Sequence, residues 1–168
     1  MIALIRGKLR RKHDDRVVIE AAPGAVTVLD AGVITTASTQ PLEARLNAIY
    51  RAVLQIIEAR TPAFLVVEDL YAEYKFPRTA ILMGHARGVI YLAARQLGVG
   101  VTALAPSEVK RAVTGSGSAG KAQVQRGVQT LLGLKDLPRP SHVADALGLA
   151  VTGLARITGI TPNARAVR

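Results

Sequence analysis

The sequence contains no cysteine and no tryptophan, and aromatic residues make up only 4% of it. The absence of cysteine excludes a disulfide framework. It also means that cysteine usage does not indicate an oxidising or a reducing compartment, so the cytosol is the default expectation. No stretch approaches the roughly 18 uncharged apolar residues that span a bilayer, and the start of the chain does not resemble a secretory signal. We therefore expect a soluble, cytoplasmic protein without a membrane partner.

Length and charge indicate the number of domains and the kind of partner. A chain of 168 residues fits one ordinary domain, which we expect over residues 1–158, followed by a basic, disordered tail over residues 159–168. The net charge of +10 favours a polyanionic partner, because each phosphate contact releases condensed counterions. A solubilising surface explains the same charge, but the basic residues cluster near the start of the chain and in the tail. The early cluster comprises Arg6, Lys8, Arg10, Arg11, Lys12 and Arg16.

Hydrophobic periodicity predicts an alternating series of strands and helices. Three β-like runs at residues 1–5, 16–21 and 25–36 indicate an antiparallel meander. Residues 63–67 are a β-branched run typical of a strand covered on both faces, and this run delivers Glu68 at its C-terminal end. The other predicted elements are helices at residues 41–60, 77–97, 107–114 and 121–132, a strand at residues 99–104, and a final helix from Ser141.

Two acidic residues and a histidine are candidates for one shared site. His142 and Asp145 lie three residues apart near the start of the final helix, so they share one face of it. Glu68 meets them if that helix packs across the sheet. Each also has an ordinary explanation alone: Glu68 as a strand-end charge, His142 as a surface imidazole, and Asp145 as an acid that the helix dipole favours in the first turn.

Three spaced blocks of sequence strengthen this candidate site. The first block consists of VEDLY at residues 67–71 and MGHARG at residues 83–88. The second consists of PSEVK at residues 106–110 and TGSGSAGK at residues 114–121, and the third is SHVADAL at residues 141–147. Together, and in unbroken order within residues 26–158, they resemble the RuvC-type Holliday-junction resolvases far more specifically than any short pattern would.

This resemblance implies an α/β protein of the RNase H-like superfamily, with a mixed five-stranded sheet flanked by helices. It implies a homodimer that cuts four-way DNA junctions in recombination and repair, with a branch-migration helicase complex as a partner. It also implies that Glu68, His142 and Asp145 form a catalytic site that binds Mg²⁺ or Mn²⁺, with two ions per site. His142 stands where many family members carry Asp, and imidazole suits manganese better than magnesium. A preference for Mn²⁺ over Mg²⁺ is therefore worth testing.

The resemblance also assigns residues that contact DNA. Lys110 and Lys121 flank a loop of small residues, where their ammonium groups reach phosphates near the scissile bond. Lys121 also begins a helix, where an anion is favoured. Two solvated lysines would be the ordinary explanation of this pair. Further expected contacts with the DNA backbone are Arg78, Arg87 and Arg111.

An aromatic residue is expected to enter the centre of the junction. Tyr71 follows Glu68 by three residues, where family members carry an aromatic that stacks on bases. Tyr74 and Phe76 are alternatives, because the segment at residues 72–77 is one residue longer than the family pattern. A buried core aromatic is the competing explanation, and it fits Phe64 better.

The start of the chain departs from the family pattern. Family members open with a strand that ends in Gly-Ile-Asp-Pro-Gly, whose Asp is the central metal ligand, whereas residues 4–9 read LIRGKL. The nearest acids are Asp14 and Asp15, beyond a basic stretch. Three functions therefore stay open: an active resolvase, a junction-binding protein that no longer cuts, and a general basic nucleic-acid-binding module. The persistence of Glu68, His142 and Asp145 favours the enzyme.

Overall fold

Five strands and five helices make up the part of the chain that this computed structural model describes, namely residues 2–5, 16–22, 25–32, 34–70, 77–139 and 141–159. The strands are β1 (Ile2–Ile5), β2 (Arg16–Ala22), β3 (Ala25–Gly32), β4 (Phe64–Glu68) and β5 (Gly100–Leu104). The helices are α1 (Leu42–Arg60), α2 (Pro77–Gln96), α3 (Pro106–Thr114), α4 (Lys121–Leu131) and α5 (Ser141–Thr158). Each predicted helix is therefore confirmed to within about a residue of its bounds. None of these described helices is long and apolar enough to cross a membrane.

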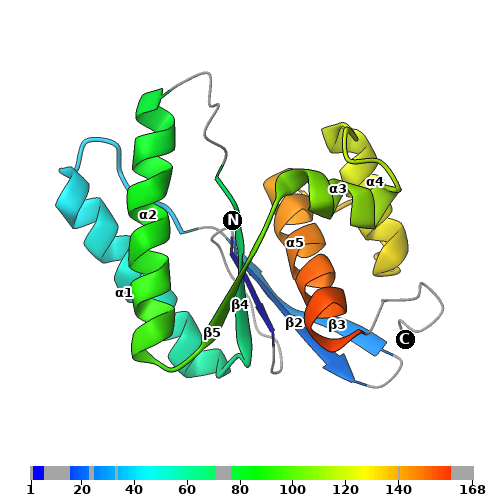
Figure 1. The fold of residues 1–168 in the computed structure, drawn as a ribbon, viewed down its shortest axis with the longest axis horizontal. Helices are drawn as coiled ribbons and strands as arrows, with labels where there is room; N and C mark the ends of the chain where they lie inside the picture. The colour runs from blue at the N-terminus through cyan, green and yellow to red at the C-terminus, as the bar shows by residue number, and fades with distance from the viewer. Residues whose placement is uncertain are drawn as a thin grey trace.

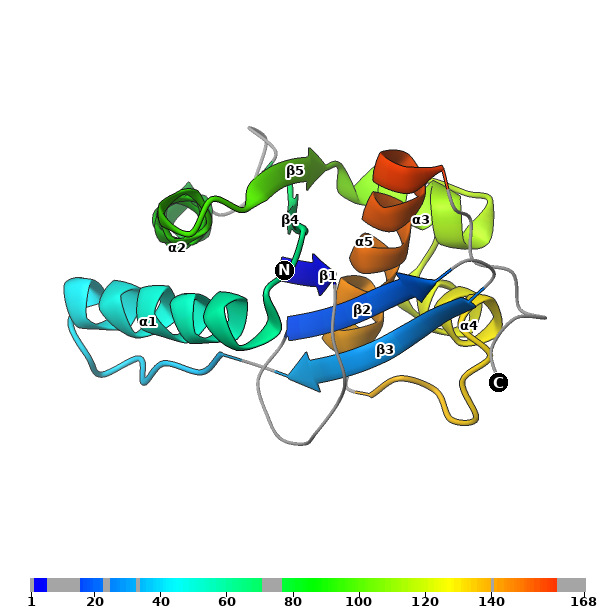
Figure 2. The ribbon, with the colours of Figure 1, turned by 90° about the horizontal axis from the view of Figure 1, so that it is seen from below.

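The strands form one mixed sheet in the order β3-β2-β1-β4-β5. β2 and β3 pair antiparallel across a short link, while β4 and β5 pair parallel because α2 returns the chain between them. Helices cover both faces of this sheet, as Figures 1 and 2 show. The expected α/β class, with a mixed five-stranded sheet flanked by helices, is confirmed.

The predicted antiparallel meander over residues 1–36 is wrong in its first pairing. β1 runs parallel to β2 and antiparallel to β4. Hydrophobic alternation decides which face of a sheet a side chain takes, but it does not specify strand direction, so the short run of β1 fits either orientation. β3 is also shorter than predicted. It ends at Gly32, which pairs with Arg16, the first residue of β2.

Two apolar cores lie on opposite faces of the sheet. One lies between β4 and the helices α1 and α2, and it includes Leu65, Val67 and Ile90. The other lies under α5, with α3 and α4 packed around it, and it includes Val66 and Leu104. Because successive side chains of a strand point to opposite faces, β4 contributes to both cores. β4 is therefore held firmly from both sides up to the point where it ends.

α5 crosses the sheet and contacts β1, β2, β4 and β5. Its predicted inward face is confirmed: Leu147, Ala150, Val151 and Leu154 are buried, and Val143 packs against the same core. The closest approach is at Gly153, where an added Cβ would lie 2.4 Å from Cγ2 of Val66. The absence of a side chain at this position thus lets the helix lie directly on β4.

Candidate active site

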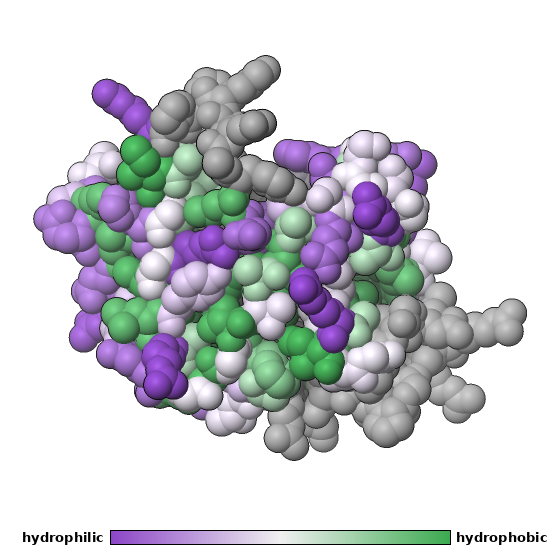
Figure 3. Space-filling view, viewed as in Figure 1, coloured by the Kyte–Doolittle hydropathy of each residue, from purple (hydrophilic) through white to green (hydrophobic). Residues whose placement is uncertain are grey.

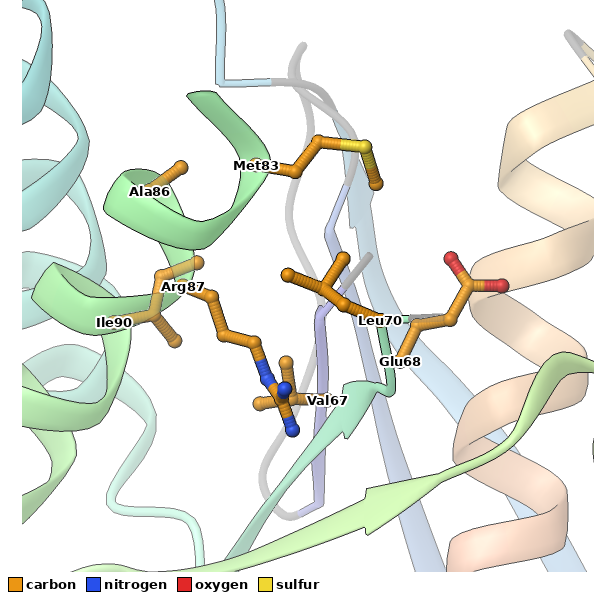
Figure 4. Close-up of a pocket in the computed structure, with 7 residues that line it drawn as sticks. All are labelled: Val67, Glu68, Leu70, Met83, Ala86, Arg87 and Ile90. Atoms are coloured by element: carbon orange, nitrogen blue, oxygen red, sulfur yellow. The ribbon is translucent and has the colours of Figure 1, made fainter. Parts of the chain in front are cut away.

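Glu68 is the last residue of β4 and carries a half-buried side chain. Leu65 and Val67 belong to the core under α1 and α2, whereas Val66 belongs to the core under α5. The period of two therefore directs Glu68 toward the α5 side of the sheet. Figure 4 shows the Glu68 carboxylate turned away from α2 and toward α5. A buried strand thus presents a carboxylate at its C-terminal end.

Asp145 approaches Glu68 from α5. Its side chain is half-buried, and its negative charge acts on Glu68. Burial raises the pKa of the Glu68 carboxyl above its ordinary value, and the charge of Asp145 raises the pKa further. Asp145 is the fifth residue of α5, so it lies beyond the first helical turn, contrary to prediction. The helix dipole is therefore a weaker reason for an acid here, because its effect fades within that turn.

Lys110 completes the charged group that the structure describes at this place. It lies on α3, is half-buried, and its positive charge lowers the pKa of Glu68, against the effects of burial and Asp145. The structure thus brings together three residues that the sequence singled out, from β4, α3 and α5. A raised carboxyl pKa, maintained by burial and a like charge, is typical of functional sites.

The predicted third metal ligand, His142, lies three residues before Asp145 on α5. Its backbone is placed, while its side chain lies outside the described residues. Among the described side chains, no group of three or more His, Cys, Asp or Glu is arranged to hold a metal ion. The carboxylates described at this site are therefore a pair, Glu68 and Asp145.

On the other face of β4, Asp69 is joined to α2. Its Oδ1 lies 2.9 Å from Nη2 of Arg87 and accepts a hydrogen bond of 3.0 Å from the backbone N–H of Leu70. The Asp69 N–H in turn donates to the carbonyl of Leu104 at 2.8 Å, which extends the pairing with β5 by one residue. Figure 4 shows Arg87 reaching from α2 toward Val67, on the side opposite the Glu68 carboxylate.

Comparison with known proteins places this arrangement in a family. The family model described as "Crossover junction endodeoxyribonuclease RuvC" matches residues 14–153. The chain belongs to the RuvC family. It is 45% identical over 134 residues to the RuvC of Moorella thermoacetica, covering 80% of each chain. It is 44% identical over 135 residues to the RuvC of Treponema pallidum, covering 80% of this chain and 68% of that relative.

Solved RuvC structures share the fold. The RuvC of Thermus thermophilus matches with a TM-score of 0.74 and 31% identity, over 96% of this chain and 99% of that one. The same protein in complex with its Holliday-junction substrate matches with a TM-score of 0.72 and 31% identity, over 90% and 92% of the two chains. The expected RNase H-like architecture is thereby confirmed.

The departure from the RuvC pattern at the start of the chain is also visible in the structure. β1 consists of the four apolar residues IALI, so this strand supplies no carboxylate beside β4. The match to the RuvC family model begins at residue 14, and residues 1–13 lie outside it. Asp14 and Asp15, the nearest acids in sequence, lie outside the described residues.

The residues expected to contact DNA differ in exposure. Lys121, the first residue of α4, and Arg111 on α3 are exposed on either side of the loop at residues 115–120. Arg87 has only 21% of its side chain exposed. Tyr71, Tyr74 and Phe76, the three aromatic candidates, lie outside the described residues.

Sequence reasoning missed the link between Asp69 and Arg87. It assigned no role to Asp69 and treated Arg87 as a phosphate contact. The one available signal was the spacing of Arg87 and Tyr91, which stand four residues apart on one face of α2. That spacing indicates mutual contact but does not reveal which acid the arginine meets.

Proposed function

We propose that this chain is a structure-selective endonuclease that cuts four-way DNA junctions by metal-dependent hydrolysis of phosphodiester bonds. The observation that supports this most directly is the approach of Glu68 and Asp145 from β4 and α5, beside Lys110, in a member of the RuvC family. The relatives are named crossover junction endodeoxyribonucleases, and one of the similar solved structures is a complex with a Holliday junction.

The donor set fits a hard divalent cation. Two carboxylates approach each other in a half-buried place, where burial and their mutual repulsion raise the pKa of Glu68, and a cation between them would offset both effects. Glu68, Asp145 and His142 would hold Mg²⁺ or Mn²⁺, and we propose two ions per site. Such ions, when bound, activate the attacking water and stabilise the leaving oxygen. Lys110 and Lys121 would hold phosphates of the substrate.

A junction-binding protein that no longer cuts is the second candidate function. It is favoured by one observation, the lack of a carboxylate in β1. Loss of a ligand shared by two ions weakens metal binding and the orientation of the water, while the basic surface is unaffected. The retention of Glu68, His142 and Asp145 together favours the enzyme, because binding alone does not require them.

One gel experiment separates these functions from a general nucleic-acid-binding module. The purified protein is incubated with a synthetic four-way junction or a linear duplex, each with Mg²⁺, with Mn²⁺ or with a chelator. Symmetric nicks in the junction that require the metal support the proposed enzyme. A metal-independent shift of the junction without nicks supports the binder, and equal affinity for duplex and junction supports the general module.

Lys121→Ala is expected to weaken junction binding and to reduce its dependence on salt. Lys121 is exposed at the start of α4, beside the loop that we expect to face the DNA. Loss of one phosphate contact lowers the slope of log K against log salt by about one. The slope is measured by titrating a labelled junction between low and moderate salt. Lys135→Ala, an exposed lysine after α4, is the matched control, and an unaltered slope in Lys121→Ala removes this residue from the interface.

We propose that two copies of the chain pair through α2, because a four-way junction offers two equivalent strands to cut. Ile81 and Leu92 lie eleven residues apart, on one face of this helix, with 60% and 51% of their surfaces exposed. Figure 3 shows apolar side chains at the surface over α2. A two-fold contact that buries this face on both copies forms a self-complementary interface.

Leu92→Asp is therefore expected to shift the protein from dimer to monomer. An aspartate within an apolar two-fold contact lies near the same aspartate of the second copy. The two like charges repel each other, and both lose their hydration when the copies pair. Sedimentation of the wild type and the variant over a concentration series measures the effect, with a rise of the dimer Kd by about 100-fold or more as the expected result. Leu42→Asp, at the exposed start of α1, is the control. A dimer of unchanged affinity in Leu92→Asp excludes this face.

Two further parts of the proposal concern the location of the protein and its protein partner. A protein that acts on junctions in chromosomal DNA works where that DNA is, so we infer a cytoplasmic location. A branch-migration helicase complex as partner rests on the family resemblance alone, and co-purification with such a complex tests it.

A further inference from the structure

The geometry points to Arg87 as a positioning residue that fixes the direction of Glu68 through Asp69, and not as a contact for DNA phosphate. This inference rests on the proposed function, because it assigns a role within the same site. It starts from the alternation at the end of β4. Glu68 points to the α5 side of the sheet, and the next residue, Asp69, is bound by Arg87 from the α2 side.

Asp69 is fixed by three contacts. Its carboxylate meets Nη2 of Arg87 at 2.9 Å and accepts from the Leu70 N–H at 3.0 Å, and its own N–H donates to Leu104 at 2.8 Å. The backbone from which Glu68 projects is therefore held from β5 and from α2. Of these three contacts, the one with Arg87 joins the end of β4 to a helix, whereas the other two lie within the sheet and its end. It therefore fixes the distance between the strand end and α2.

Arg87 is itself held in place. Its guanidinium carbon lies 4.9 Å from the centre of the Tyr91 ring, and its Nη2 donates to the Tyr91 hydroxyl at 2.5 Å. The Nε atom is buried and has no hydrogen-bond partner among the described residues. With 21% of the side chain exposed and the charge paired with Asp69, Arg87 has little freedom to reach a phosphate. A planar guanidinium that both stacks and pairs is suited to fixing geometry.

The contact between Arg87 and Asp69 affects the proposed reaction through the position of Glu68. A metal ligand must be held to within a fraction of an ångström, and a displacement of about 1 Å can cost on the order of 100-fold in rate. When the contact between Arg87 and Asp69 is lost, the end of β4 is freed from α2 one residue after Glu68. The rate and the metal affinity then fall, whereas the basic surface that binds DNA is unchanged.

The test compares Arg87→Met, Asp69→Asn and the double variant with the wild type. Single-turnover cleavage of a four-way junction is measured at saturating protein, junction affinity is measured over a salt series, and Mn²⁺ binding is measured by electron paramagnetic resonance. Each single change is expected to slow cleavage by about 10- to 100-fold and to weaken Mn²⁺ binding. The double variant is expected to be no slower than either single one, because both changes remove the same contact. Junction affinity and its salt slope stay at the wild-type values.

Two variants sharpen the comparison. Arg95→Met removes an exposed arginine from the last turn of α2 and is expected to cleave at the wild-type rate. Arg87→Lys keeps the charge but loses the planar stack on Tyr91, so it is expected to restore part of the rate that Arg87→Met loses. If Arg87→Met does not fold, the isosteric Asp69→Asn still tests the inference.

Several results would overturn the inference. A salt slope that falls by about one in Arg87→Met identifies a phosphate contact. Losses that multiply in the double variant show that Arg87 does not act through Asp69, and unchanged cleavage and Mn²⁺ binding show that it does not act on Glu68. If the wild type itself does not cut junctions, the proposed function fails, and Mn²⁺ affinity in the variants still decides the role of Arg87.

Discussion

Glu68→Gln is expected to reduce junction cleavage by at least about 1000-fold, equivalent to roughly 4 kcal/mol of transition-state stabilisation. The substitution keeps the size of the side chain and removes the charge that would bind a divalent cation between β4 and α5. Junction affinity is expected to stay the same or to rise slightly, because a negative charge near the DNA phosphates is lost. Cleavage and gel-shift assays on the same junction measure the two effects. Unchanged cleavage would refute the assignment of Glu68 to the site.

The same variant has a second, independent readout in the metal-free protein. Burial and the like charge of Asp145 raise the pKa of Glu68, so the folded state binds this proton more tightly than the unfolded chain. Such a group stabilises the fold at low pH, and that contribution is lost as pH rises. At neutral pH the charged Glu68 is therefore a penalty, which the amide relieves. We expect the melting temperature of Glu68→Gln without metal to be higher than that of the wild type.

Matched variants show whether these effects belong to the site. Asp145→Asn is expected to reproduce the loss of cleavage, because it removes the other member of the pair. Glu58→Gln, an exposed position on α1, is expected to change neither cleavage nor stability. Mn²⁺ is expected to raise the melting temperature of the wild type, since it binds only the folded state, and to raise that of Glu68→Gln much less.

The sequence allowed the helices and the buried strand β4 to be predicted because burial leaves a periodic trace. The inward face of α5 follows the helical period, and Leu147, Ala150, Val151 and Leu154 are buried as expected. The end of the continuous apolar run in β4 located Glu68. These are local signals, since each depends on residues a few positions apart and on one face being removed from water.

The parts that could not be predicted depend on contacts between distant segments. The direction of β1 leaves no trace in its sequence, because four apolar residues satisfy the same alternation in either orientation. The partner of Arg87 lies eighteen residues earlier in the chain, and an acid that follows a strand looks the same whether it faces solvent or an arginine. The distance between α5 and β4 depends on one glycine, whose importance appears only when Val66 is seen opposite it.

That glycine provides the second large expected effect. Gly153→Ala would place a methyl group 2.4 Å from Cγ2 and 3.0 Å from Cγ1 of Val66, a fully buried residue at the centre of β4. A β-branched side chain has little rotamer freedom with which to move aside, so α5 must lift from the sheet. Overpacking of this kind costs about 1–3 kcal/mol. For a chain of this size that is a fall in melting temperature of roughly 3–10 °C.

Gly153→Ala is also expected to slow cleavage by about 100-fold at temperatures where the variant remains folded. Asp145 lies on the same helix, so a lift of α5 by about 1 Å separates it from Glu68, which β4 holds in place. Melting curves and single-turnover cleavage measure the two effects. Gly84→Ala is the control, because among the described residues its new methyl meets only Leu70, at an ordinary 4.0 Å. Val66→Ala in the same chain makes room for the methyl, so the double variant is expected to be less destabilised than the sum of the two single changes. Strict additivity would show that the two residues do not meet, and α5 would then not be held against β4 at this point.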